Sequence, residues 1–111
     1  MGRFLEPRQE EAAAAGVRIL WTEGAVANLA AIEAYIEAAH SPRTALKEVR
    51  KIIDQVEGLA RFPHSGRPGR APGTRELVVA PYVVAYRVEG DSLQILRVLH
   101  GRQRWPAAFP R

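Results

Sequence analysis

Apolar and polar residues alternate over the short stretch VRILW at residues 17–21, and the period changes directly after it. Alternation of β-branched and aromatic side chains is typical of a strand, so we expect residues 17–21 to form the first one. Thr22 is a good N-cap for a following helix. Apolar side chains then recur at spacings of three and four, at Val26, Leu29, Ile32, Ile36 and Ala39. This period predicts a helix over residues 23–39 with one apolar stripe.

A second helix is predicted where HSPRT interrupts the first pattern. Ser41 is a suitable N-cap, and Pro42 fits the first helical position because its missing N–H would have no partner there. The stripe of this helix is expected to be Leu46, Val49, Ile53, Val56 and Ala60, with Ile52 and Leu59 beside it. Two amphipathic helices joined by a few residues form an antiparallel hairpin.

The rest of the chain alternates between a loop and short strands. Residues 62–75, FPHSGRPGRAPGTR, hold three prolines and three glycines, and we expect neither helix nor strand there. Three apolar stretches follow at 76–80, 82–88 and 92–99, the last two separated by the turn Glu89-Gly90-Asp91. They predict a three-strand antiparallel meander. With the leading strand in the same sheet, hairpin and meander describe a two-layer α+β fold with an antiparallel sheet.

The chain of 111 residues is long enough for one domain and too short for two. We expect that domain to comprise residues 17–111. Residues 1–16 carry no apolar stripe, although EEAAAA favours helix, and are predicted to form a flexible N-terminal arm. The chain has no cysteine, no apolar run near the ~20 residues that span a membrane, and no signal-peptide segment, so a cytoplasmic location is expected.

Charge is distributed unevenly along the chain. Residues 1–60 hold 7 Lys/Arg and 9 Asp/Glu, whereas residues 61–111 hold 9 and 3, so the two parts carry −2 and +6. Such asymmetry favours an acidic partner, nucleic acid or protein, for the second part. A solvated basic face without a partner is the alternative.

Three arginines lie on successive predicted strands. The side chains of Arg75, Arg87 and Arg97 could fall on one face of the sheet. Arg87 is expected to face solvent, on the side opposite Tyr86. An arginine ladder of this kind can bind phosphates, but it can also protect an exposed sheet face from aggregation.

The last predicted strand runs into the cluster His100-Gly101-Arg102-Gln103-Arg104-Trp105. An imidazole for proton transfer, guanidinium groups for phosphate and an indole for stacking fit contact with a nucleic acid. Alternatively, Trp105 covers the end of the sheet and His100 binds the backbone. The three histidines, at 40, 64 and 100, have no metal-ligand spacing, so we expect neither metal nor cofactor.

The order of these elements, with the stretches WTEGAVANLAAIEAYI, RFPHSGRPGRAPGTREL and PYVVAYRVEGDSLQILRVLHGRQRWP, resembles the RelE/ParE superfamily of toxins from bacterial type II toxin–antitoxin modules. The resemblance covers residues 17–106. Its most specific part runs from Pro72 to His100 and includes Tyr86-Arg87-Val88. It implies a growth-inhibiting toxin, of a kind that also stabilises plasmids, and a cognate antitoxin that neutralises it.

The superfamily divides by target. RelE-like members, which cut mRNA on the ribosome, carry several basic residues, and Arg75 and Arg102 match two of these positions. Leu77 and Val83 stand where two further cations would be. If the chain is such an endoribonuclease, the resemblance implies His100, Arg102 and Arg75 as catalytic residues. ParE-like members poison DNA gyrase without this set and keep the fold and the basic end, so the sequence favours a gyrase inhibitor over an enzyme.

The resemblance also implies two contact surfaces. The target is expected to meet Arg75, Arg87, Arg97, Arg102, Arg104 and Trp105. An acidic antitoxin that folds on binding is expected to cover Leu29, Ile36, Leu46, Val49 and Ile53 in a hetero-oligomer, with no membrane involved. Three functions stay open at this point: a gyrase poison, an mRNA interferase, and an inactive toxin-derived binding or regulatory module.

Overall fold

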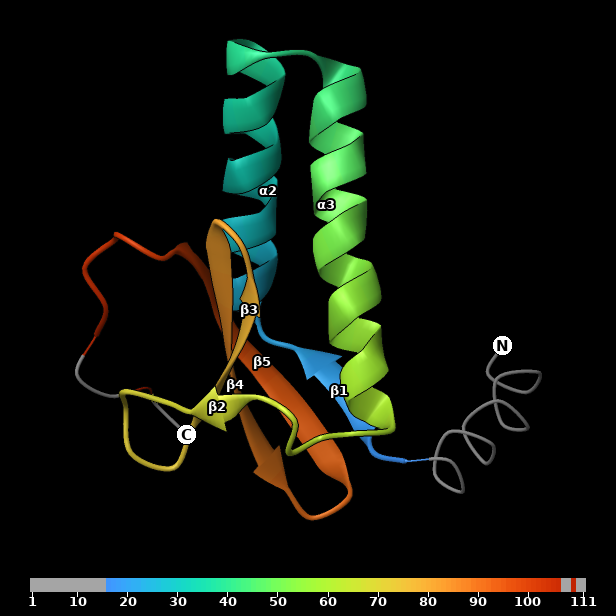
Figure 1. Ribbon diagram of the computed structural model, residues 1–111, viewed down its shortest axis with the longest axis vertical. Coiled ribbons are helices and arrows are strands. Elements are labelled where there is room, and N and C mark those ends of the chain that lie inside the picture. The colour runs from blue at the N-terminus through green and yellow to red at the C-terminus, as the bar shows by residue number, and fades with distance from the viewer. Residues whose placement is uncertain (1–15, 107–108, 110–111) are drawn as a thin grey trace.

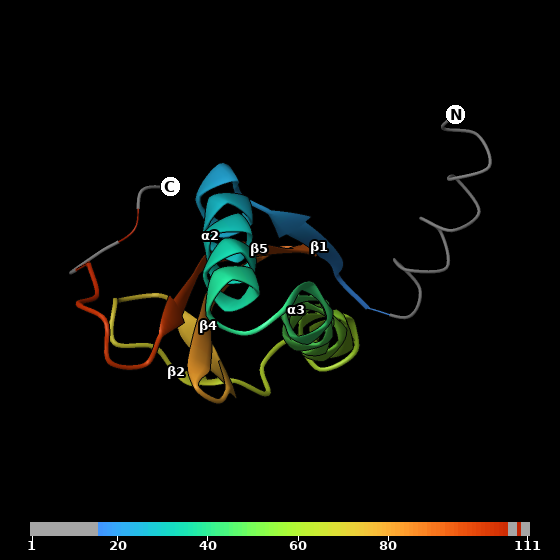
Figure 2. The ribbon, with the colours of Figure 1, turned by 90° about the horizontal axis from the view of Figure 1, so that it is seen from above.

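The computed structural model describes residues 16–106 and 109 of the chain. Two helices, α2 (Glu23–Ala39) and α3 (Pro42–Glu57), form a hairpin that packs on one face of a five-stranded sheet (Figure 1). The strands are β1 (Arg18–Trp21), β2 (Arg67–Pro68), β3 (Arg75–Val79), β4 (Tyr82–Glu89) and β5 (Ser92–His100), in the spatial order β1-β5-β4-β3-β2. The connected end of the hairpin projects beyond the strands, and Figure 2, which looks along the helices, shows them side by side. The α+β prediction is confirmed.

Both helices begin at the residues that the sequence predicts. Thr22 Oγ1 accepts a hydrogen bond from Ala25 N at 3.2 Å, and Ser41 Oγ accepts one from Thr44 N at 3.0 Å. Pro42 lies in the first turn of α3. These side chains satisfy backbone N–H groups that have no partner inside a helix, which is why the local sequence suffices to place the starts.

The apolar stripe of α3 is rotated by about one residue from the predicted one. Its buried positions are Ala45, Ile52 and Val56, continued by Leu59 of the short 3₁₀ helix η1 (Gly58–Ala60). Leu46, which was expected to face inward, is 60% exposed. One residue turns an α-helix by about 100°, so a stripe read from apolar spacing alone can be shifted by one position. The small side chain of Ala45 takes the inward position, and the larger Leu46 stays outside.

The sheet is mixed, because β1 pairs with β5 in parallel while β3, β4 and β5 form the predicted antiparallel meander. The prediction of a wholly antiparallel sheet was therefore wrong for its first strand. The helical hairpin connects β1 to the rest of the sheet, and a connection of that length allows the two strands to run in the same direction. Thr22 joins the layers at this point, since its Oγ1 donates to Ile95 O at 2.7 Å.

The loop over residues 62–75 contains regular structure that its composition did not predict. Arg67 and Pro68 form the edge strand β2, which pairs with the start of β3. A proline is tolerated there because an edge strand leaves one side of its backbone unpaired. Tyr86 fastens the loop from within the core: its hydroxyl accepts from Gly66 N at 2.9 Å and donates to Pro63 O at 2.8 Å.

The core lies between the helices and the sheet, and a smaller apolar cluster covers the opposite face. The central residues are Ala25, Ile52, Val56, Leu59, Val79, Val84, Tyr86, Leu93, Ile95 and Val98. On the opposite face Ala85 and Leu96 are covered by Ala71 from the loop and by Trp105 and Phe109, which follow β5. We call residues 101–106 and Phe109 the C-terminal segment. Leu96 is the extra residue of a bulge in β5, so that Leu96 and the next residue, Arg97, both lie on this second face.

The N-terminal boundary is described only in part. Residues 1–15 of the predicted arm lie outside the described residues, and the boundary at Val17 stays a prediction. Val17 N donates to Ala60 O at 3.0 Å, which ties the start of β1 to the end of η1. Within residues 16–106 and 109, no helix has the length and apolar character needed to cross a membrane.

Candidate functional site: a basic surface on two faces of the sheet

The three strand arginines do not share one face, contrary to the expectation from the sequence. Arg75 pairs with Tyr86 and so lies on the helix side of the sheet. Arg87 and Arg97 lie on the second face, Arg97 opposite Ala85. The strand boundaries decide this outcome, because a shift of one residue turns every side chain to the other face.

Arg87 is 6% exposed, so the prediction that it faces solvent was wrong. The C-terminal segment crosses the second face above it, and Arg87 Nη2 donates to Phe109 O at 3.4 Å. The C-terminal segment has no regular structure and therefore no periodic pattern in the sequence. Its position over Arg87 could not be predicted for this reason. Arg87 therefore holds the segment from below and does not present its guanidinium to a partner.

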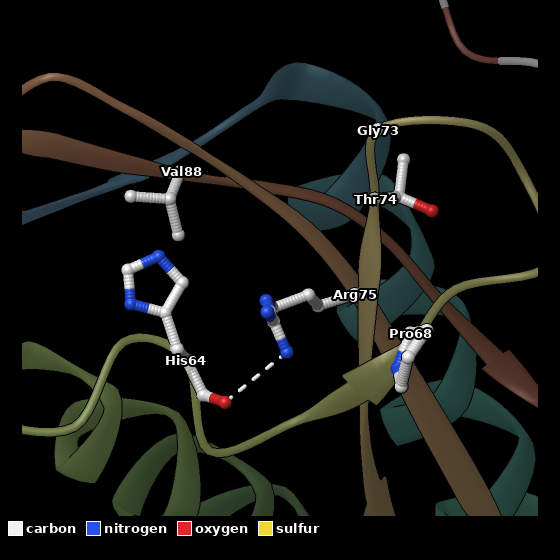
Figure 3. Close-up of a pocket in the computed structure, with 6 residues that line it drawn as sticks. All are labelled: His64, Pro68, Gly73, Thr74, Arg75 and Val88. Atoms are coloured by element: carbon white, nitrogen blue, oxygen red, sulfur yellow. Dashed lines mark hydrogen bonds between the residues drawn. The ribbon is translucent and has the colours of Figure 1, made fainter.

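Arg75 lies beside a hollow of about 310 Å³ that is also lined by His64, Pro68, Gly73, Thr74 and Val88 (Figure 3). Its Nη1 donates to Gly66 O at 2.7 Å and to His64 O at 3.1 Å. These two bonds fix the direction of the guanidinium, which points toward His64 in Figure 3. Arg75 therefore supports the backbone of the loop as well as lining a basic hollow.

Arg97 lies between two hollows on the second face. One, of about 300 Å³, is bounded by the start of α2 and by Phe109. The other, of about 330 Å³, is lined by Arg97, Leu99, Arg104, Trp105 and Pro106, and we call these five residues the C-terminal platform. Its floor is apolar, its rim carries two guanidinium groups, and none of its lining residues is acidic. Such a surface suits a partner that offers an apolar side chain beside a negative charge.

A buried carboxylate that the sequence analysis missed organises the loop under this platform. Glu76 of β3 is 3% exposed and accepts five hydrogen bonds, two from the Arg67 side chain, two from the Arg70 side chain and one from the Arg70 backbone. The guanidinium carbon of Arg70 lies 4.1 Å from the centroid of the Trp105 ring. The signal available in the sequence was one acidic residue directly after a loop with three arginines.

Glu76 makes the stability of the fold depend on pH in the acid range. Burial raises the pKa of Glu76, but hydrogen bonds from the Arg70 backbone and from the Arg70 and Arg67 side chains outweigh it, so the pKa lies below the ordinary 4.5. A depressed carboxylate pKa stabilises the fold above the unfolded-state value, and this stabilisation is lost as the pH falls through the folded-state value.

Replacing Glu76 by glutamine should therefore lower the free energy of unfolding at pH 7 by about 1–2 kcal/mol, because both arginine partners are partly exposed and their bonds are screened. Below the ordinary pKa of 4.5 the loss should shrink as the wild-type carboxylate is protonated. Urea unfolding of both proteins between pH 7 and pH 3 measures this. A constant difference across that range would show that the charge of Glu76 does not stabilise the fold.

His100 is held in a turn after β5. Its Nδ1 accepts from Arg102 N at 3.1 Å, its backbone N–H donates to Gln103 Oε1 at 2.7 Å, and its ring meets Tyr82 edge-on at 5.9 Å. Arg75 and His100 pair with β4 at positions four residues apart, on its two sides. Their backbones are thus about 13 Å apart along the strand and about 10 Å apart across it. Of the three residues proposed for RNA cleavage, His100 and Arg102 are bonded neighbours in one turn, whereas Arg75 lies apart from them with its guanidinium bonded to the loop backbone.

The residues expected to bind the antitoxin differ widely in exposure. Ile36 is 5% exposed, Leu29, Val49 and Ile53 are half-buried, and Leu46 is 60% exposed. Two further apolar residues of α2 are exposed: Tyr35, at 69%, was not predicted as a contact, and Val26, at 54%, was predicted in the apolar stripe of the helix, which was wrong for this residue. The hairpin therefore offers a partner Leu46, Tyr35 and Val26 more directly than Ile36. In the described part of the chain, no three His, Cys, Asp or Glu residues gather where they could hold a metal ion.

Comparison with known proteins relates the chain to one family of toxins. Residues 19–105 match the family described as ParE toxin of type II toxin–antitoxin system, parDE. Y4kP of Sinorhizobium fredii, whose name describes it as a candidate toxin, is 47% identical over 91 residues, which cover 80% of this chain and 93% of that protein. Toxin ParE3 of Caulobacter vibrioides is 34% identical over 67 residues, covering 59% of this chain and 67% of that protein.

A solved structure, titled a chromosomal ParDE toxin–antitoxin system from P. aeruginosa, has the same fold. One of its chains superimposes with a TM-score of 0.72 at 35% sequence identity, covering 76% of this chain and 95% of that one. The family match over residues 19–105 spans both the helical hairpin and the meander.

Proposed function

This chain belongs to the family of ParE toxins of type II toxin–antitoxin systems, and we propose that it stops growth by binding and poisoning DNA gyrase. The observation that carries the proposal is the C-terminal platform, a basic surface with an apolar floor and no acidic residue in its lining. Poisoning of gyrase is the role of the family. A toxin of this kind needs a binding surface and no catalytic residues of its own.

The alternative of mRNA cleavage finds less support in the geometry. General acid–base catalysis needs two partnered groups within reach of one phosphate. His100 has its Nδ1 occupied by Arg102 N, and Arg75 is fastened to the backbone of the loop. Leu77 is half-buried on the helix side and Val83 is buried on the second face, so both serve packing at positions where cleavage would require cations. The chain is therefore proposed to be an inhibitor and not an enzyme.

The chain is further proposed to form a complex with an acidic antitoxin. Its structural neighbour was solved as a ParDE toxin–antitoxin system. Leu46 and Tyr35 expose apolar side chains on the projecting end of the hairpin, where a helix of the partner could bury them. Because gyrase acts on chromosomal DNA, the proposal places the action of the toxin in the cytoplasm.

The test measures both targets with one preparation of toxin. Purified protein should inhibit supercoiling by gyrase or trap cleaved DNA, and should leave message intact in a translating extract. Pre-incubation with the antitoxin encoded beside the toxin should restore supercoiling, which controls for contaminating nucleases. Cleavage of ribosome-bound message without an effect on gyrase would contradict the proposal. Normal growth during confirmed expression of folded toxin would instead indicate an inactive binding module.

A further inference from the structure

The C-terminal segment that carries the platform is attached to the second face by a few side-chain contacts. Phe109, 8% exposed, packs with Ala71, Ala85 and Leu96, and Trp105 packs against the same cluster. The buried Trp105 Nε1 has no hydrogen-bond acceptor among the described residues. The indole is therefore not oriented by a hydrogen bond to any described residue. Its position depends on packing and on the guanidinium of Arg70.

Arg70 is itself placed by Glu76. Its side chain is 42% exposed, so packing alone does not select one rotamer. Both oxygens of the carboxylate bind it: Arg70 Nε and backbone N donate to Oε2 at 3.0 and 2.9 Å, and Nη2 donates to Oε1 at 3.3 Å. Bonds to both oxygens fix the plane of a guanidinium as well as its position. Attraction between a cation and an aromatic ring requires the charge to lie over the ring face. The bonds to Glu76 hold the guanidinium in this position, with its carbon 4.1 Å from the centroid of the Trp105 ring.

We propose that Glu76 is a positioning residue for toxin action: through Arg70 it fixes Trp105 and thereby the C-terminal platform that meets the target. Glu76 lies under the segment and needs no contact with the target. This inference rests on the proposed function only in requiring that the platform meets the target, whichever macromolecule that target is.

The chain offers a matched control. Arg67 also donates two hydrogen bonds to Glu76, at 3.1 and 2.9 Å, but the guanidinium that lies over the Trp105 ring is that of Arg70. Arg67→Gln thus removes a charge and two bonds from the same carboxylate without removing the cation over the indole. A role that is merely structural would make Arg67→Gln and Arg70→Gln equivalent.

The experiment follows the two tryptophans by ¹⁹F NMR of toxin labelled with 5-fluorotryptophan. Trp21 packs against the core on the helix side and serves as an internal reference for the fold. In Glu76→Gln and Arg70→Gln the Trp105 resonance should shift toward that of solvent-exposed indole while the Trp21 resonance stays in place. The ratio of detached to attached Trp105 should rise about tenfold, since at least one charge-assisted contact is lost. Arg67→Gln should leave both resonances unchanged, and Arg70→Lys should give a smaller shift.

Toxicity is scored on the same variants as growth arrest after induction, in parallel with gyrase inhibition. Potency should fall in Glu76→Gln and Arg70→Gln in proportion to the fraction of molecules whose Trp105 stays attached, as read from the ¹⁹F resonance, and should be retained in Arg67→Gln. Growth arrest keeps the test valid if gyrase is not the target. An unmoved Trp105 resonance in Glu76→Gln would overturn the inference. So would a moved resonance with unchanged potency, or equal losses in all three glutamine variants with a displaced Trp21 resonance.

Discussion

Replacing Tyr86 by phenylalanine should lower the free energy of unfolding by about 2–4 kcal/mol, a large effect for the loss of one oxygen atom. The side chain is fully buried, and its hydroxyl links two backbone groups of the loop, Gly66 N–H and Pro63 C=O. Phenylalanine fills the same space but leaves both groups without this partner. Each unsatisfied buried group costs about 1–3 kcal/mol, somewhat less where water can reach it.

The measurement is equilibrium unfolding in urea, with Tyr35→Phe as the control. Tyr35 is 69% exposed, so its substitution should change the free energy by less than about 0.5 kcal/mol. Burial raises the pKa of Tyr86, so the hydroxyl keeps its proton and can donate to Pro63 O throughout the neutral range. A loss below about 0.5 kcal/mol in Tyr86→Phe would mean that the loop is held by other contacts.

Gly66 lies at the same junction, and its lack of a side chain allows the loop to approach the sheet. A Cβ added there would lie 2.6 Å from Tyr86 Oη and 2.8 Å from Glu76 O, too close for either atom. The loop can approach the sheet only because this residue has no side chain. This junction holds the loop against the core. It therefore helps to fix the positions of Arg70 within the loop and of Arg75 at its end, and with them the shape of the basic surface on both faces.

The local sequence predicted those parts of the fold that depend on neighbours in the chain. Thr22 and Ser41 cap the two helices because a cap needs only the backbone a few residues ahead. The stripe of α3 was displaced by one position because nothing local distinguishes Ala45 from Leu46 as the inward residue. The parallel pairing of β1 depends on how the hairpin returns the chain, which no short stretch of sequence specifies.

The sequence predicted which residues belong to the contact surface more reliably than it predicted on which face of the sheet they lie. Arg97, Arg104 and Trp105 were expected in a contact surface, and the structure brings them together around one hollow. Arg75 was expected beside them but lies on the other face of the sheet, and Arg87 is covered. Both differences come from pairing register and from the C-terminal segment, which are properties of the folded chain. Glu76 was missed because its partners are brought to it only when β2 pairs with β3.

The largest functional loss is expected from the double variant Arg97→Gln/Arg104→Gln. The two side chains form the charged rim of the platform, and among the described residues neither donates a hydrogen bond or forms an ion pair, so their removal should alter folding little. Each charge-assisted contact to a partner contributes about 1.5–3 kcal/mol, so losing two should weaken gyrase inhibition about a hundredfold or more.

The control for this variant is Arg43→Gln/Arg50→Gln, which removes the same charge from exposed positions of α3. Long-range attraction between a basic protein and an acidic target would fall similarly in both double variants and would weaken with salt. Direct contact at the platform predicts that only the Arg97/Arg104 variant loses inhibition, and that the difference between the two variants persists at raised ionic strength. Equal losses in the two double variants would mean that Arg97 and Arg104 act only by long-range attraction of the target. Full activity of the Arg97/Arg104 variant would place the target contact elsewhere on the toxin. Because folding and growth arrest can be measured on the same proteins, a loss of inhibition with an unchanged unfolding curve locates the effect at the interface itself.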